Sequence, residues 1–117
     1  MDAKQVAFGT IEIDGRRYDH DVVVEAGQVR KRKKRPSKAH RAAFGHTPVS
    51  IDEAIPWSAH RLIIGTGASG AMPVMPEVLE EARSRGVDVV MLPTAAACEA
   101  LAAEDSQSAA AILHVTC

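Results

Sequence analysis

Aromatic residues are scarce in this 117-residue chain, which holds two Phe, one Tyr and one Trp. The hydrophobic core must therefore be aliphatic, built from Val, Ile, Leu, Ala and Met. Surfaces on which nucleic-acid bases stack need several exposed aromatic rings, so the scarcity argues against a surface of that kind.

Cysteine is also rare, with only Cys98 and Cys117. Neither has the spacing of a metal site or of a C-x-x-C redox pair, and a small secreted domain would normally carry more cysteines. No segment approaches the ~18 apolar residues of a membrane span, and residues 1–8 lack the apolar centre of a signal peptide. We therefore expect a cytoplasmic protein that has no membrane partner.

The net charge of −1 hides an uneven distribution. Half of the fourteen basic residues fall in segment 30–38, and they are Arg30, Lys31, Arg32, Lys33, Lys34, Arg35 and Lys38. The rest of the chain has seven basic and fifteen acidic residues, a net charge of −8. We expect this basic run to form a surface that is solvated, or docked against an acidic partner or against the acidic remainder of the chain itself. Nucleic-acid binding through phosphate contacts is an alternative, although no known nucleic-acid-binding signature accompanies the run.

The first third of the chain predicts an antiparallel meander over residues 8–31. Phe8–Ile13 alternates apolar and polar residues, as in a half-buried strand. The dipeptide Asp14-Gly15 is a strong hairpin signal, because a type I′ turn needs positive φ at both central residues. Tyr18–Val24 is predicted as the returning strand and Gln28–Lys31 as a short third strand.

The following segment, residues 32–48, lacks hydrophobic periodicity and contains Pro36, Gly45 and Pro48. We predict that it is a loop with a basic start. Ser50 and Glu53 have the spacing of a capping box, which predicts a short helix over residues 51–55.

The second half predicts a β-α-β-α-β unit over residues 61–117. Three aliphatic runs, 61–65, 87–92 and 109–115, are typical of strands that are buried on both faces. The first helix is predicted to begin at Pro76 and to end at Gly86, and the second to run from a Thr94 cap to about residue 103. This alternation favours parallel strands with right-handed crossovers. The length suits one α/β domain over residues 1–117, with a mostly parallel central sheet.

Parallel strands bring their carboxyl ends to one edge, where open α/β sheets bind their ligands. The polar and glycine residues expected at this edge are Gly65, Thr66, Gly67, Ser69, Thr94, His114 and Thr116. Their backbone amides, hydroxyls and imidazole could bind a small anion. The alternative is that the glycines only allow a tight connection and that the polar side chains satisfy backbone groups.

The segment Gly65–Gly70 spells G-x-G-x-x-G, yet its context does not fit a dinucleotide site. Pro76 places the helix start after the last glycine, and the acidic residue about 20 positions on, Asp88, would begin the next strand rather than end it. The five histidines lack the spacing of a zinc site. His114 and Cys117 are three residues apart, so in a strand they would face opposite sides. We predict no cofactor, no metal and no catalytic residues.

Several short segments, in this order, resemble one known family. They are Ile13-Asp14-Gly15, His20-Asp21-Val22-Val23, His46-Thr47-Pro48-Val49-Ser50, Ile63-Ile64-Gly65-Thr66-Gly67, Pro93-Thr94 and His114-Val115-Thr116-Cys117. The chain resembles the Mth-type domain family of unknown function, which includes an adipogenesis-associated domain protein and a mitochondrial assembly factor for respiratory complex I. The resemblance implies a three-layer α/β domain with an added β-meander, and it supplies no catalytic residues.

Three hypotheses for function follow. The leading one is a non-catalytic module that binds a protein partner or assists an assembly, because no catalytic set is evident. The first alternative is a protein or enzyme that binds a small molecule or anion at the Gly65–Gly70 edge. The third is nucleic-acid binding through segment 30–38.

Overall fold

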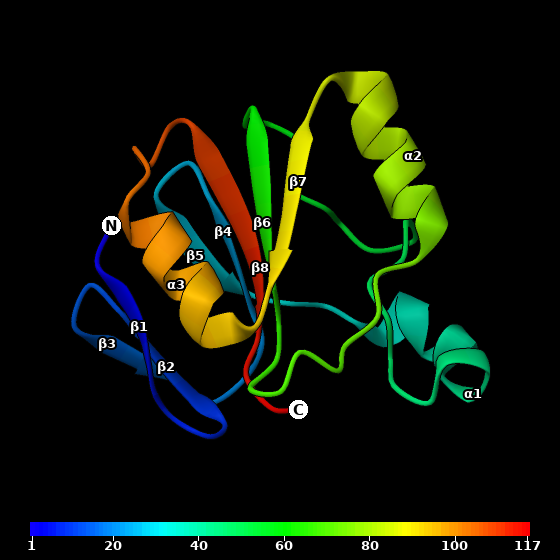
Figure 1. The fold of residues 1–117 in the computed structure, drawn as a ribbon, viewed down its shortest axis with the longest axis horizontal. Helices are drawn as coiled ribbons and strands as arrows, with labels where there is room; N and C mark the ends of the chain where they lie inside the picture. The colour runs from blue at the N-terminus through cyan, green and yellow to red at the C-terminus, as the bar shows by residue number, and fades with distance from the viewer.

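Two β-sheets form the frame of the protein in a computed structural model that describes residues 1–117 (Figure 1). The smaller sheet is antiparallel, in the order β1 (Ala3–Ala7), β2 (Thr10–Ile13), β3 (Arg16–Tyr18). The larger sheet has the order β5-β4-β8-β6-β7. Its strands are β4 (Val22–Glu25), β5 (Gln28–Lys31), β6 (Arg61–Thr66), β7 (Asp88–Leu92) and β8 (Ala109–His114).

Two longer helices cover opposite faces of the larger sheet (Figure 1). They are α2 (Pro76–Arg85) and α3 (Thr94–Ala102). Between β5 and β6 the chain forms a 3₁₀ helix, η1 (Arg35–His40), and a single turn of α-helix, α1 (Arg41–Phe44). None of the helices has the length and apolar character needed to cross a membrane.

Strand alternation divides the core into two parts. On β6, Ile63 joins the part that contains α3 and the small sheet, while Leu62 and Ile64 join the part beneath α2. All three side chains are fully buried, and each such burial contributes roughly 1.5–3 kcal/mol. The larger sheet is thus the middle of three layers, which confirms the predicted three-layer α/β fold.

The strands and helices of the second half confirm the sequence prediction. β6 pairs in parallel with both β7 and β8, as the β-α-β-α-β pattern requires. Helix α2 begins at Pro76 and ends at Gly86, which has a left-handed φ of 71°. The hairpin turn at Asp14-Gly15 has positive φ at both residues, 50° and 85°. The larger sheet is mixed because β4 and β5 extend it on the antiparallel side of β8.

The single meander predicted for residues 8–31 is wrong in its strand pairing. The returning strand over Tyr18–Val24 is broken, because β3 ends at Tyr18 in the small sheet and β4 begins at Val22 in the large one. Asp21 lies at this crossing, and its carboxylate accepts the Val115 amide at 3.0 Å. That bond attaches the segment between β3 and β4 to the end of β8, where the chain passes from the small sheet to the large one.

Three further local predictions also fail in part. Segment 32–48 contains η1 and α1 and is not simply a loop. The Glu53 carboxylate does accept the Ser50 amide, at 3.4 Å, as the capping box predicts, but residues 51–53 form a turn instead of a helix. Thr94 is the first residue of α3 and not its cap, since its hydroxyl bonds to backbone groups on neighbouring segments.

Arg32 is buried, although it belongs to the basic run. Its side chain is 1% exposed, and its guanidinium donates two hydrogen bonds to Glu53, each 2.8 Å long, and one to Asp21 at 3.0 Å. The Ser37 hydroxyl donates to the same Glu53 carboxylate. The predicted surface position of Arg32 is therefore wrong, because two buried carboxylates need a buried counter-charge.

The last residues of the chain run along the loop that follows β6. The amides of Ala68 and Ala71 donate to the backbone oxygens of Thr116 and Cys117, at 2.8 Å and 3.1 Å. This close approach requires glycine at position 67, where φ is +105° and an added Cβ would lie 2.5 Å from the Thr116 oxygen.

We expect Gly67→Ala to destabilise the protein more than Gly86→Ala. Both glycines have positive φ, but only the Gly67 site lacks space for a methyl group. The conformational cost alone is about 1–2 kcal/mol at Gly86, whereas the added clash should bring Gly67→Ala to about 3 kcal/mol or more. Urea unfolding of both variants measures the difference, and equal losses would contradict the packing described here.

Arg32→Leu should cost about 3–5 kcal/mol of unfolding free energy, because it leaves the buried Glu53 carboxylate without a counter-charge and removes one partner of the buried Asp21 carboxylate. Arg30→Leu is the matched control: Arg30 pairs with Glu25 at 3.0 Å, but its side chain is 44% exposed. Its loss should stay below about 1 kcal/mol. Chemical unfolding measures both losses. Equal losses of unfolding free energy in the two variants would show that the Arg32 network is not a structural constraint.

Candidate functional site

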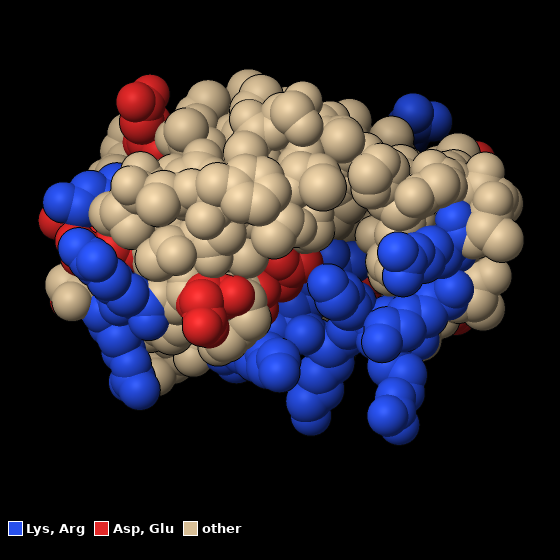
Figure 2. Space-filling model, turned by 90° about the horizontal axis from the view of Figure 1, so that it is seen from below, with Lys and Arg blue, Asp and Glu red and all other residues tan.

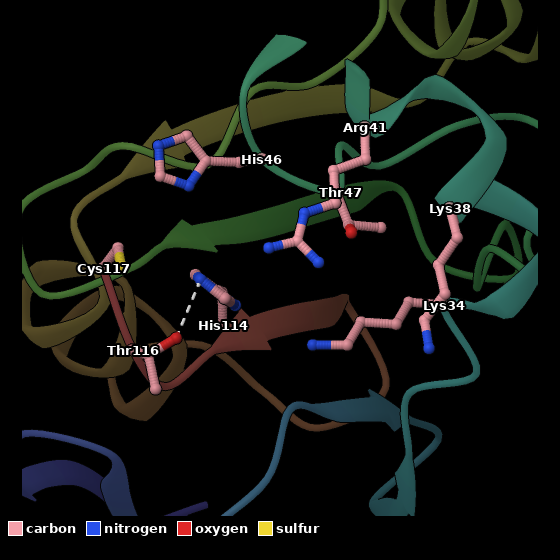
Figure 3. Close-up of a pocket in the computed structure, with 8 residues that line it drawn as sticks. All are labelled: Lys34, Lys38, Arg41, His46, Thr47, His114, Thr116 and Cys117. Atoms are coloured by element: carbon pink, nitrogen blue, oxygen red, sulfur yellow. Dashed lines mark hydrogen bonds between the residues drawn. The ribbon is translucent and has the colours of Figure 1, made fainter. Parts of the chain in front are cut away.

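A pocket of about 370 Å³ lies between segment 34–47 and the end of β8. One wall is formed by residues that follow β5, and the other by the last residues of the chain. The lining residues are Lys34, Lys38, Arg41, His46, Thr47, His114, Thr116 and Cys117 (Figure 3). Figure 2 shows the molecule from below, and Lys and Arg side chains gather along the lower border of this view.

The basic wall is built on the two short helices η1 and α1. Lys34 immediately precedes η1, Lys38 belongs to η1 and Arg41 begins α1, and all three side chains line the pocket. Figure 3 shows the Lys34 and Arg41 side chains directed into the same space as His114. Lys38 and Arg41 form no salt bridge, and Lys34 reaches only the Asp21 carboxylate, at 4.0 Å. Two of the three cations of this wall, Lys38 and Arg41, are therefore not paired with any carboxylate of the chain.

The opposite wall holds His114 in one orientation. The His114 Nδ1 atom lies 2.8 Å from the Asp21 carboxylate, and its Nε2 atom lies 3.3 Å from the Thr116 hydroxyl. Strand alternation explains the second contact, because residues two apart point to the same side. An ionised carboxylate can only accept, so the Asp21 contact assigns a proton to Nδ1, and Nε2 accepts from the Thr116 hydroxyl whenever the ring carries that one proton.

Asp21 is the charged group behind this wall. Burial by itself would raise the pKa of Asp21, but the hydrogen bond and charge of His114, the Val115 amide and the Arg32 charge together lower it to about 2. The Asp21 carboxylate is thus ionised at neutral pH and acts as a permanent acceptor for the His114 ring.

The predicted site residues separate into three groups in the structure. Lys34, Lys38, His114 and Thr116 line the pocket. The rest of the basic run lies outside it: Arg30 pairs with Glu25, Arg32 is buried, and Lys31, Lys33 and Arg35 line a separate surface hollow.

The third group belongs to the structure behind the pocket. The Gly67 amide donates to the Thr94 hydroxyl, which donates in turn to the His114 carbonyl oxygen. These bonds join the ends of β6 and β8 to the start of α3.

The backbone amides of the glycine loop are engaged within the chain. The amide and hydroxyl of Ser69 and the amide of Ala71 all donate to the Cys117 backbone oxygen. Gly70 and Met72 donate to oxygens within the loop. An external anion at Gly65–Gly70 would have to displace the C-terminal residues. Thr66 donates its hydroxyl to the Leu92 carbonyl, and Gly65 is packed against Leu113, so neither reaches the pocket.

Five residues of the site escaped the sequence prediction, namely Asp21, Arg41, His46, Thr47 and Cys117. Asp21, His46, Thr47 and Cys117 all stood in segments that carried the family resemblance, which was the usable signal. Cys117 reaches the same pocket as His114 because β8 ends at His114, so strand alternation does not extend to position 117. The pairing of Asp21 could not be predicted, because its partner His114 is 93 positions away.

Solved structures with the same fold include proteins without an assigned activity. A conserved hypothetical protein from Pyrococcus horikoshii OT3, PH1505, is 27% identical, with a TM-score of 0.82 and 100% of both chains covered. The protein MT938 is 27% identical, with a TM-score of 0.72, covering 98% of this chain and 97% of its own. An outer membrane protein from Bartonella henselae, 14% identical with a TM-score of 0.63, covers 97% of this chain and 95% of its own, and shares the fold alone.

Among curated proteins, no significant match to the chain was found. A family model described as "Protein of unknown function (DUF498/DUF598)" matches residues 3–114, which includes both sheets and all the helices. The chain therefore belongs to the DUF498/DUF598 family of proteins of unknown function.

Proposed function

We propose that this protein binds a small anionic ligand, one that carries a phosphate or carboxylate group, in the pocket beside β8. The observation that carries the proposal is the lining of the pocket: three cationic side chains, two imidazoles, two hydroxyl groups and one thiol, without any carboxylate side chain. Clustered cations repel one another, and a bound anion relieves that repulsion.

The size and chemistry of the pocket narrow the ligand class. A volume of about 370 Å³ falls at the small end of the range for small-molecule sites. The lining contains no Phe, Tyr or Trp, so it lacks the large aromatic rings on which nucleobases usually stack. Arginine and lysine at close quarters suit the oxygen atoms of a phosphate or carboxylate. A compact polyanion fits these properties better than a nucleotide or a polynucleotide does.

A protein-binding or assembly-assisting module is the second candidate. It is favoured by basic residues outside the pocket, which line an open hollow of about 500 Å³ together with Lys34 and Lys38. Its chemistry fits an acidic segment of a protein partner, and the resemblance to the Mth-type family, with its complex I assembly factor, is in keeping with such a role. A cytoplasmic location is part of this proposal, and the two unpaired cysteines are consistent with a reducing compartment.

Thermal unfolding with inorganic pyrophosphate or with citrate tests the anion-binding proposal and separates phosphate from carboxylate recognition. A ligand at 100 times its Kd stabilises by about 2.7 kcal/mol, which should raise Tm by roughly 10 °C. Sodium chloride at the same ionic strength should not reproduce the shift. Arg41→Gln should remove most of the shift, whereas Arg35→Gln, the same charge change outside the pocket, should retain it.

The two candidates respond differently to a third variant. Neutralising Lys31, Lys33 and Arg35 together leaves the pocket intact and removes the outer basic surface. Retained anion binding by this variant supports the pocket. Equal loss of anion binding in Arg35→Gln and Arg41→Gln would mean that only net charge matters, and the absence of any shift with either probe would refute the proposal.

A further inference from the structure

Asp21, His114 and Thr116 form a hydrogen-bonded chain that ends in the pocket. The Asp21 carboxylate is 2.8 Å from His114 Nδ1, and His114 Nε2 is 3.3 Å from the Thr116 hydroxyl. The first two side chains are 5% and 12% exposed, whereas Thr116 lines the pocket and is only partly buried. Solvent exposure therefore increases along the chain, from the buried carboxylate of Asp21 to the Thr116 hydroxyl, which a ligand can reach.

The hydrogen bonds from Thr116 to His114 and from His114 to Asp21 run in the direction that activates a hydroxyl as a nucleophile. Asp21 accepts from Nδ1–H, which leaves a lone pair on Nε2 to accept from the Thr116 hydroxyl. A hydroxyl next to a base that is itself oriented by a third group is the arrangement found in acyl-transfer enzymes. Arg32 and the Val115 amide hold Asp21 in turn, at 3.0 Å each, so the base cannot rotate freely.

The need of buried polar groups for hydrogen-bond partners does not account for the contact between Thr116 and His114. A buried polar group needs a partner, but the Thr116 hydroxyl faces a water-accessible pocket. Its contact with His114 is therefore not required to bury either group. In contrast, the Thr94 hydroxyl is fully buried and bonds to the Gly67 amide and the His114 carbonyl oxygen, as a structural threonine does.

We propose that Thr116 is a nucleophile, activated by His114 as general base, and that the pocket hydrolyses small carboxylic esters that carry a second, anionic group. Asp21 is a positioning residue in this scheme. The inference rests on the proposed function, because Lys38, Arg41 and His46 would hold the anionic group while the ester carbon meets Thr116. Lys34, whose ammonium lies 4.0 Å from the Asp21 carboxylate and whose side chain is directed into the same space as His114 (Figure 3), would face the carbonyl oxygen on which negative charge develops.

The reaction needs only the ester and water. The Thr116 oxygen forms a bond to the ester carbon, and its proton passes to His114 Nε2. The bond from that carbon to the alcohol oxygen then breaks, and the alcohol leaves with the proton from His114. Water attacks the acyl-threonine and gives a proton to His114, the acid is released, and the Thr116 oxygen recovers its proton. The balance is one ester and one water converted to one acid and one alcohol.

The test uses the mono-4-nitrophenyl ester of succinic acid and, as the neutral counterpart of equal acyl length, 4-nitrophenyl butyrate. We expect faster release of nitrophenol from the anionic ester by at least ~10-fold in kcat/KM. Intact-mass measurement after rapid acid quench should show one added succinyl group, and peptide mapping should place it on Thr116. This readout uses the unaltered protein, so it does not depend on how variants fold.

Variants separate the nucleophile from its neighbours. Thr116→Val should lower kcat by at least ~100-fold, while Thr116→Ser, which keeps the hydroxyl, should retain activity within ~10-fold. His60→Ala is the control, because His60 is exposed and lies outside the pocket. Arg41→Gln should raise KM for the anionic ester more than for the neutral ester, so that the preference for the anionic ester falls.

Three results would overturn the inference. Pyrophosphate or citrate binding without nitrophenol release above the buffer rate would leave the proposed function standing and refute the activity. Full activity in Thr116→Val would refute the nucleophile, because water would then react directly. Acylation of Thr116 without preference for the anionic ester, together with the absence of anion binding, would refute the substrate class and the proposed function.

Discussion

The carboxylate of Asp21 is the constraint on which the pocket depends. It accepts from Arg32 on one side and from His114 and the Val115 amide on the other, at 3.0, 2.8 and 3.0 Å. A buried charge is costly unless each of its partners is in place. Arg32 is thereby held beside the end of β8, and the segment that follows Arg32 lies opposite His114. The pocket is the space that remains between these two parts of the chain.

This constraint also explains where the charge of the chain resides. Arg32 uses its charge internally, and Arg30 pairs with Glu25, so these two members of the basic run are neutralised. Lys38 and Arg41 continue from the buried anchor and have no acidic partner, which makes their proximity unfavourable in the absence of a ligand. Local arrangements that oppose stability are characteristic of functional sites. The same fold therefore supplies a rigid support and a region of unrelieved positive charge.

The sequence predicted the features that depend on short-range patterns. Proline at position 76 and glycine at 86 marked the ends of α2, and the Asp14-Gly15 turn followed from the need for positive φ. The alternation of strands and helices was sufficient to predict that β6, β7 and β8 are parallel, and hence that His114 and Thr116 lie at a common edge. The sequence did not reveal that Arg32 is buried, because its partners Asp21 and Glu53 are 11 and 21 positions away. Ion pairs at such separations leave no periodic trace, so the turn at Glu53 and the pocket wall could not be predicted.

The most direct test of this account is an NMR titration of the Asp21 side-chain carboxyl carbon. With Arg32, His114 and the Val115 amide in place, we predict a pKa of about 2, against the ordinary value of 3.8. Because the folded pKa lies below the unfolded one, the stability that Asp21 contributes is present above about pH 4 and is lost as the pH falls toward 2. A measured pKa at or above 3.8 would contradict the account, since it would show that Asp21 does not hold the two walls of the pocket together.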